Sequence, residues 1–261
     1  MVDYKKVEEF WDRQAEEDPD QAGILGTRGP TAARFRADAE WRSFLRLVPP
    51  QKNWDILELG CGAGRWCFRL APRVRFVRGV DLSREMIKLA AAEKIKHRME
   101  NVSFQKASLL DFSPPETYDL IYFSGVLNHI HDAEIEPLLQ RLLPALKPGG
   151  RILSRDSVRP EGRKVMTGEY PIIYRTLAEY SAPFQTAGFK LTSYQESFLW
   201  PRAEERFARL FSRDFQRGHP RLSMAGFVGL EYLARFLVQA GYLQPLSPRE
   251  LLHLFMLFER A

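Results

Sequence analysis

Short apolar segments alternate with amphipathic ones between residues 53 and 197, and this alternation restricts the fold more than any other feature of the sequence. Segments typical of buried strands are followed by segments with helical periodicity. At this spacing each helix crosses over to the start of the next strand, so the strands lie parallel. The expected strands begin with 55–59, 76–80 and 102–104 and continue with 118–123, 151–155 and 189–197, and the expected helices are 83–96, 133–146 and 176–187.

The segments on both sides of this core are predicted to be mostly helical. Residues 2–17 and 31–48 place their apolar side chains at helical spacing. Residues 201–246 break the alternation with two further expected helices. Ser247 could cap a helix formed by the apolar segment 251–258. The other elements leave the sheet one strand short, however, so we predict that this segment is a strand.

The pattern therefore predicts an α/β fold with a mainly parallel sheet and helices on both of its faces. The predicted organisation is an N-terminal helical lid (1–52), a ligand-binding core (53–200), a helical insertion (201–246) and the last strand of the core (247–261).

Composition narrows the environment of the protein. The chain has 261 residues, of which 45% are hydrophobic and 27% are charged, and this is too apolar for a disordered protein. The first residues form no apolar secretory segment and no stretch is apolar enough to span a membrane, so we expect a cytoplasmic protein. Cys61 and Cys67 are too few for a disulfide framework or a zinc site, and we expect no metal.

A glycine loop follows the first expected strand. Gly60, Gly62 and Gly64 allow a ligand to approach the backbone closely at the carboxyl end of that strand. The dinucleotide-binding pattern Gly-x-Gly-x-x-Gly fails, because Arg65 or Cys67 occupies its last position. An arginine beside the loop suits a ligand that carries a carboxylate, since guanidinium and carboxylate groups form bidentate pairs.

Asp81 stands 21 positions after Gly60, where the second expected strand ends. A carboxylate at this point can accept hydrogen bonds from both hydroxyl groups of a bound ribose. The loop and Asp81 together indicate a nucleoside-containing ligand.

Four motifs in order resemble those of the class I S-adenosylmethionine-dependent methyltransferases. Glu58–Arg65 resembles the first motif and Val80–Met86 the second. Tyr118–Phe123 is similar to the fourth-strand motif, and Leu142–Gly150 to the helix and turn before the fifth strand. The resemblance covers about residues 54–198 and implies a Rossmann-like sheet of seven mainly parallel strands.

The resemblance implies S-adenosyl-L-methionine as the methyl donor and S-adenosyl-L-homocysteine as its product. Arg65 would meet the methionine carboxylate and Asp81 the ribose, while Ser108 stands where many relatives have aspartate. The residues implied in donor binding are Gly60, Cys61, Gly62, Gly64, Arg65, Asp81, Leu82, Met86, Ala107, Ser108, Leu109, Phe123 and Ser124.

The acceptor side is expected where the fourth and fifth strands end. Transfer from a sulfonium is an in-line displacement, so a general base is needed only when the acceptor must lose a proton. His129 and Asp156 are the candidate catalytic residues at these two ends. The candidate acceptor residues are Trp11, Tyr170, Tyr174 and Arg175.

We expect transfer to an oxygen or nitrogen atom of a small molecule. The segments Asp111–Pro114, Val126–His129 and Arg155–Ser157 are also laid out as in α-N-terminal protein methyltransferases. Those enzymes carry a tryptophan where Ser124–Val126 stands here, which argues against their specificity for a terminal amine. A protein N-terminal amine is therefore kept only as the alternative acceptor. A non-catalytic binding protein with the same fold is a further alternative. No Asn/Asp-Pro-Pro-aromatic motif follows the fourth strand, and a nucleic-acid acceptor is not expected.

Five arginines recur at helical spacing in the expected insertion: Arg202, Arg206, Arg209, Arg213 and Arg217. They account for part of the net charge of +5, a mild excess that requires no anionic partner. This row is compatible with a solvated helix face, a lid over an anionic acceptor, a membrane-surface contact, which we do not favour, or a dimer contact. We expect a monomer or a homodimer.

Overall fold

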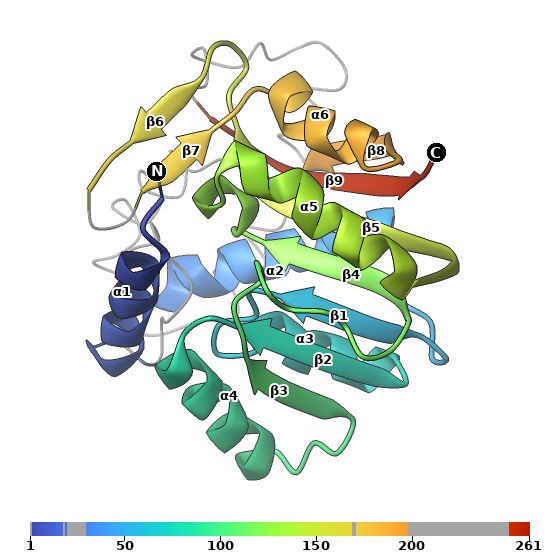
Figure 1. The fold of residues 1–261 in the computed structure, drawn as a ribbon. Helices are drawn as coiled ribbons and strands as arrows, with labels where there is room; N and C mark the ends of the chain where they lie inside the picture. Colours follow the sequence, from blue (N-terminus) through green and yellow to red (C-terminus); the bar gives the residue numbers. More distant parts are fainter. Residues whose placement is uncertain (1, 18, 20–29, 169–170, 198–250) are drawn as a thin grey trace, which may run out of the picture.

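One seven-stranded sheet organises the computed structural model, which describes residues 2–17, 19, 30–168, 171–197 and 251–261. The strands lie in the order β3-β2-β1-β4-β5-β9-β8 (Figure 1). The first five are parallel, and β9 runs antiparallel to both of its neighbours. Their bounds are β1 Asp55–Leu59, β2 Phe76–Asp81, β3 Val102–Lys106, β4 Tyr118–Ser124, β5 Leu146–Val158, β8 Phe189–Glu196 and β9 Leu252–Arg260.

Helices cover both faces of this sheet. Side chains of β4 alternate between the faces, so that Leu120 packs in one apolar cluster and Ile121 in the other. Leu138 of α5 and Phe184 of α6 cover the face of Ile121, and Phe44 of α2 covers the face of Leu120. Figure 1 shows α5 in front of the sheet and α2 and α3 behind it. The helices are α1 Tyr4–Glu17, α2 Pro30–Leu47, α3 Arg65–Leu70, α4 Arg84–Lys96, α5 Asp132–Leu142 and α6 Leu177–Thr186, with short 3-10 turns at Ala71–Arg73, Leu127–His129 and Leu143–Ala145.

The predicted fold class is confirmed, as are the seven strands of the sheet. Local sequence signals account for two helix starts: Ser83 caps α4 by accepting a hydrogen bond from the Met86 amide, and Thr176 and Glu179 form a reciprocal capping box at α6. The terminal segment is a strand, as predicted, because β9 fills the position between β5 and β8.

The structure differs from the predictions at two places. The segment 147–150 was expected as a turn but lies within β5, where the pairing with β4 shifts register between Tyr118 and Leu120. A small hairpin of β6 (Lys164–Met166) and β7 (Ile172–Tyr174) was not predicted. Strands of three residues are too short to show a recognisable alternation, and the side chains of β6 are all exposed.

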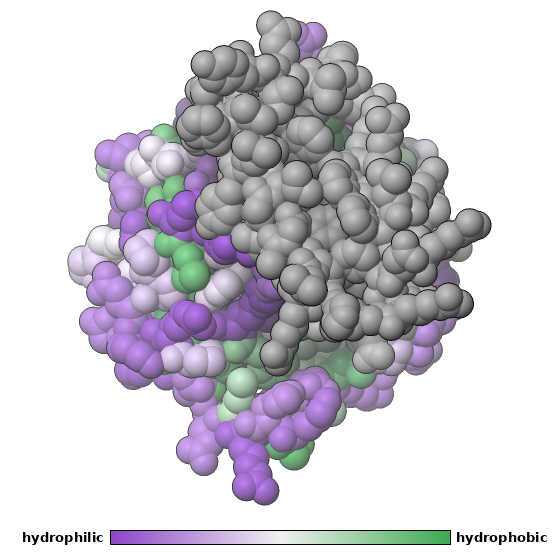
Figure 2. Space-filling view, turned by 180° about the vertical axis from the view of Figure 1, so that it is seen from behind, coloured by the Kyte–Doolittle hydropathy of each residue, from purple (hydrophilic) through white to green (hydrophobic). Residues whose placement is uncertain are grey.

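Several predictions fall outside the described residues. These are the helical insertion 201–246 with its arginine row, and Tyr170. The proposed domain boundaries stay predictions. Among the described helices, none is both long and apolar enough to cross a membrane. In the view from behind, hydrophilic residues make up most of the coloured surface, with hydrophobic residues in small patches between them (Figure 2).

Candidate active site

The glycine loop lies at the carboxyl end of β1 and is shaped by close contacts. Gly60 has a φ of 74°, and a Cβ atom there would lie 2.3 Å from Cγ2 of Val126. Gly64 has a φ of 82°, and its Cβ atom would lie 2.8 Å from the Phe104 ring. Both positions therefore require glycine for conformation and for space. The loop thereby comes close to the segment that follows β4.

Asp81 ties this loop to the end of β2. Its Oδ2 accepts a hydrogen bond from the Gly62 amide at 2.7 Å, and its Oδ1 accepts one from the Ser83 amide at 2.9 Å. Burial raises the pKa of Asp81, while these backbone donors act in the opposite direction. Each carboxylate oxygen has a second lone pair, so the group can still accept hydrogen bonds from a ligand.

The other residues predicted to bind the methyl donor lie around the glycine loop and Asp81. The Ala107 amide donates to the Asp81 carbonyl at 2.9 Å, which places the end of β3 beside the end of β2. Ser108 accepts a hydrogen bond from the Leu110 amide. The side chains of Cys61, Met86, Leu109 and Phe123 are buried, whereas Leu82 and Ser124 are partly exposed. Their contacts with a donor remain predictions.

Helix α1 bridges the carboxyl edge of the sheet. Asp12 Oδ1 accepts hydrogen bonds from the Ser83 hydroxyl at 2.5 Å and from the Glu85 amide at 3.1 Å, at the start of α4. At the other end of α1, the Tyr4 hydroxyl donates to Glu134 of α5. Figure 1 shows α1 beside α4 and close to β7. The helix therefore spans from the Asp81 side of the edge to the side where β4 ends.

The apolar side of α1 packs against both the second motif and the hairpin. The cluster consists of Val2, Tyr4, Val7, Trp11, Leu82 and Ile173. Trp11 thus lies in the same cluster as Leu82, next to the expected donor site. Its contact with an acceptor stays a prediction.

His129 lies in the 3-10 turn that follows β4. Its Nδ1 is 2.8 Å from the carbonyl oxygen of Pro171, so the neutral ring donates from Nδ1 and carries its lone pair on Nε2. Burial lowers the pKa of His129 to about 4, assisted by the positive charge of Arg175. The side chain is therefore neutral at pH 7.

We expect this histidine to make stability depend on pH. Its pKa is about 4 in the folded protein against 6.5 ordinarily, so the unfolded chain takes up the proton first as pH falls. The stabilisation is present above pH 6.5 and is lost as pH falls toward 4. Between pH 7 and pH 5 the loss from this residue is about 2 kcal/mol.

The variant His129→Asn should remove that contribution. Urea unfolding at pH 7 and pH 5 should give a difference in unfolding free energy about 2 kcal/mol smaller than in the unmodified protein. An unchanged difference would mean that His129 takes up a proton in the folded state as readily as in the unfolded state.

Asp156 is buried on β5 beside the His129 turn. Its Oδ2 accepts hydrogen bonds from the Tyr180 hydroxyl at 2.7 Å and from the Leu127 amide at 3.2 Å. The Tyr180 oxygen also lies 2.5 Å from the Ser154 hydroxyl oxygen. Burial raises the pKa of Asp156 to about 6, and the Tyr180 hydrogen bond opposes this rise. The carboxyl group therefore titrates close to neutral pH.

Arg175 is fully buried and holds the backbone around His129. Its Nε donates to Asp132 at 2.7 Å, and its terminal nitrogens donate to the carbonyl oxygens of Leu127 at 2.9 Å and of Ile130 at 2.7 Å. These contacts give the Arg175 side chain a supporting role inside the protein, in place of the acceptor contact expected from the sequence. Tyr174 is partly exposed, and burial together with the charge of Asp156 raises its pKa.

Arg65, which directly follows the glycine loop, pairs with Glu40 of α2. Both terminal nitrogens of Arg65 lie 3.3 Å from Oε2 of Glu40. Glu40, Asp12 and Tyr180 had not been singled out from the sequence. Each acts through a partner at least 24 positions away, and no local motif marks such pairs.

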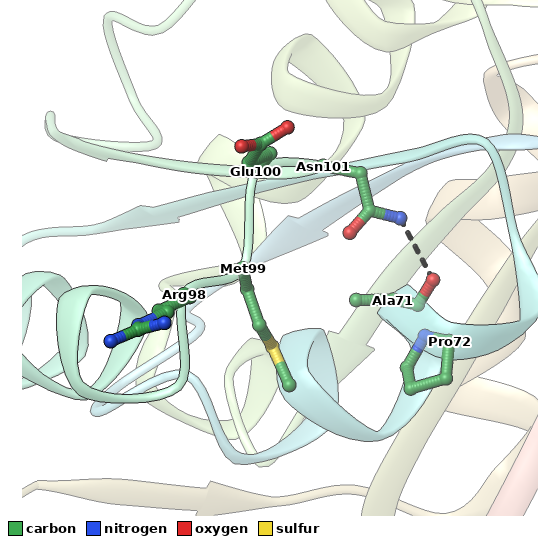
Figure 3. A pocket seen from close by; sticks show the side chains of 6 residues that line it. All are labelled: Ala71, Pro72, Arg98, Met99, Glu100 and Asn101. Carbon is green, nitrogen blue, oxygen red and sulfur yellow. Dashed lines mark hydrogen bonds between the residues drawn. The ribbon is translucent and has the colours of Figure 1, made fainter.

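A surface hollow lies at the opposite edge of the sheet. It is lined by Ala71, Pro72, Arg98, Met99, Glu100 and Asn101, just before β3 begins (Figure 3). Asn101 donates to the Ala71 carbonyl across it. In an open α/β sheet ligands bind at the carboxyl ends of the strands, so this hollow is not part of the candidate site. Within the described ranges, no three metal-ligating side chains come together.

Comparison with known proteins agrees with this geometry. Residues 56–150 match the sequence model of a methyltransferase domain. The chain is 29% identical over 183 residues to the phosphoethanolamine N-methyltransferase of Triticum aestivum, covering 67% of this chain and 34% of that protein. It is 27% identical over 193 residues to the N-terminal Xaa-Pro-Lys N-methyltransferase 1 of Mus musculus, covering 72% of this chain and 85% of that protein.

A solved structure is similar as well. The DhpI-SAH complex superimposes with a TM-score of 0.58 at 25% identity, covering 74% of this chain and 90% of that one. The chain spans only about a third of the length of the phosphoethanolamine methyltransferases that it matches. The strand order, the glycine loop with Asp81 and these matches show that the chain carries a methyltransferase domain of the class I, S-adenosylmethionine-dependent family.

Proposed function

We propose that this chain transfers the methyl group of S-adenosyl-L-methionine to a nitrogen or oxygen atom of a small-molecule acceptor. The observation that supports it most is one continuous edge of the sheet. At this edge the glycine loop and Asp81 end β1 and β2, and His129 and Asp156 lie where β4 and β5 end. A donor-binding unit thus lies beside a carboxyl group that can accept a proton and an imidazole group that can bind the acceptor.

The residues present fit this donor. The glycine loop turns with positive φ at Gly60, Gly62 and Gly64, and it lies at the carboxyl end of β1, where ligands bind in open α/β sheets. The unused lone pairs of Asp81 can accept hydrogen bonds from the two ribose hydroxyl groups. Arg65 supplies a positive charge for the methionine carboxylate. The donor itself supplies an activated methyl group.

The reaction needs little covalent chemistry from the protein. The lone pair of the acceptor atom forms the new bond to the methyl carbon, and the carbon–sulfur bond breaks with its electron pair returning to sulfur. Alignment of the acceptor with the methyl group provides most of the acceleration. An ammonium or hydroxyl acceptor must also lose one proton, before or during the transfer.

We assign the removal of this proton to Asp156 rather than to His129. A base works best when its pKa lies near the working pH. The pKa of Asp156 is about 6, so at pH 7 the carboxylate is mostly ionised and still accepts a proton. The pKa of His129 is about 4, which makes it a weak base, and we assign it to orienting the acceptor.

Two acceptors should be compared directly, because the relatives include two kinds of N-methyltransferase. One is phosphoethanolamine, and the other is a peptide that begins Xaa-Pro-Lys. The peptide is kept as a second candidate because the match to the N-terminal Xaa-Pro-Lys N-methyltransferase extends over 85% of that relative. Purified protein would be incubated with methyl-labelled donor and each acceptor, with release of S-adenosylhomocysteine as the readout.

Each outcome of this assay separates the alternatives. Methylation of phosphoethanolamine or of another small amine or alcohol supports the proposal, and methylation of the peptide alone favours the protein acceptor. Calorimetric titration with the donor tests the non-catalytic alternative. Donor binding without transfer to any acceptor of either kind would favour a binding protein, and no detectable binding at millimolar donor would refute the donor site.

The variant Asp81→Asn should weaken donor binding. An amide at this position would direct an NH₂ group at the Gly62 or Ser83 amide or at a ribose hydroxyl, and it would accept fewer hydrogen bonds. We expect the dissociation constant for S-adenosylhomocysteine to rise about 10- to 100-fold. Glu100→Gln, at the hollow on the opposite edge (Figure 3), is the control and should leave binding unchanged. Equal affinities in both variants would contradict the role of Asp81.

A further inference from the structure

A buried carboxylate lies on α2, outside the segment that matches the methyltransferase-domain model. The Glu40 side chain is fully buried, and three arginines surround it. Arg36 comes from α2 itself, Arg65 from the start of α3 and Arg155 from β5. Their positive charges hold the pKa of Glu40 well below its usual range despite the burial, so the group is charged.

The two oxygen atoms of Glu40 serve different partners. Oε1 accepts hydrogen bonds from Nε of Arg36 at 3.0 Å and from a terminal nitrogen of Arg155 at 2.5 Å. Oε2 accepts hydrogen bonds from both terminal nitrogens of Arg65 at 3.3 Å. The side chains of Arg36 and Arg155 are 15% and 8% exposed, so they fix the carboxylate from within the protein.

Arg65 is the most exposed of the three, with 27% of its side chain accessible. Its guanidinium group has five N–H donors, and the two long contacts to Glu40 use only the end formed by its terminal nitrogens. The side formed by Nε and one terminal nitrogen can form a bidentate pair with a carboxylate. Arg65 follows Gly64 directly, so its backbone lies where the glycine loop ends and α3 begins.

We propose that Glu40 is a positioning residue that orients Arg65 toward the methionine carboxylate of the donor. The proposal rests on the proposed function and deepens it. Glu40 attracts the end of the Arg65 guanidinium group and leaves its side available for a second carboxylate. Arg36 and Arg155 offset the charge of Glu40, which reduces its repulsion of the donor carboxylate. Helix α2 thereby contributes to donor recognition without touching the donor.

The test compares two ligands on the variant Glu40→Gln. S-adenosylhomocysteine contains the methionine carboxylate, whereas 5′-methylthioadenosine keeps the adenosine and the thioether but lacks the amino acid part. Calorimetry should show S-adenosylhomocysteine binding about 10- to 100-fold more weakly in the variant. Binding of 5′-methylthioadenosine should change less than about threefold, because its contacts do not involve Arg65.

Asp38→Asn is the matched control. Asp38 lies two positions away on the same helix and pairs with Arg69 at 2.5 Å instead of Arg65. Both ligands should bind this variant within about threefold of the unmodified protein.

A second pair of variants tests whether Glu40 acts through Arg65. In an Arg65→Ala background, Glu40→Gln should cause no further loss of S-adenosylhomocysteine binding. If Glu40→Gln does not fold, Glu40→Asp keeps the charge but withdraws it from Arg65, and it should show the same ligand-selective loss.

Two results would overturn the positioning role. The first is that folded Glu40→Gln loses affinity for both ligands equally. The second is that Glu40→Gln still weakens S-adenosylhomocysteine binding in the Arg65→Ala background. The failure of the proposed function looks different, because the unmodified protein would then bind neither the donor nor its product.

Discussion

Replacing Gly60 with alanine is expected to abolish donor binding and to lower the unfolding free energy by about 2–5 kcal/mol. Two costs add at this position. Alanine must adopt a φ of 74°, and its Cβ atom would lie 2.3 Å from Cγ2 of Val126. Relief of that contact moves either the glycine loop or the segment after β4, and both border the proposed donor site.

Gly149 provides a close control for Gly60→Ala. Its φ is also 74°, but a Cβ atom there would have no neighbour within 4 Å. Gly149→Ala should therefore lose only the conformational part, about 1–2 kcal/mol, and should bind S-adenosylhomocysteine normally. Urea unfolding and calorimetric titration measure both effects. Normal binding by Gly60→Ala would mean that the loop does not form the donor site.

Replacing Arg175 with methionine should destabilise the protein by about 3–5 kcal/mol. Methionine fills much of the same volume but leaves the buried carbonyl oxygens of Leu127 and Ile130 without their donor. These carbonyls flank His129, so we also expect activity to fall because the turn after β4 loses its fixed position.

Arg163→Met separates this effect from the loss of an ion pair. Arg163 contacts the same Asp132 at 2.6 Å, but its side chain is 35% exposed. Its replacement should cost less than about 1 kcal/mol. Thermal unfolding of both variants makes the comparison. A role of Arg175 in binding the acceptor would instead raise KM and leave stability unchanged, and this result would contradict the structural role.

Much of the fold followed from patterns within single segments. Ser83 and Thr176 mark helix starts because their hydroxyl groups cap neighbouring amides, and 55–59 is recognisable as a buried strand from its composition. Glycines in a loop and an aspartate at a strand end predict the donor side in the same way. Such features depend on residues close in sequence, and local physical rules describe them.

The remaining features of the site depend on distant pairs. Arg175 was interpreted as an acceptor residue, since its position after the hairpin does not reveal the buried carbonyls of Leu127 and Ile130. Glu40 meets Arg65 and Arg155 only after α2 has packed on the sheet. Ion pairs and buried hydrogen bonds of this kind form between segments, and sequence spacing does not determine them.

The position of β9 has a consequence for biosynthesis. This strand lies between β5 and β8 in the sheet, although its residues follow those of β8 by more than 50 positions. At about 5–20 residues per second, a ribosome needs several seconds to extend the chain from β8 through β9. During that interval both β5 and β8 present unpaired edges, which favour aggregation. The nascent chain therefore completes its sheet only after residues 252–260 emerge, and a chaperone that shields strand edges should increase its folding yield.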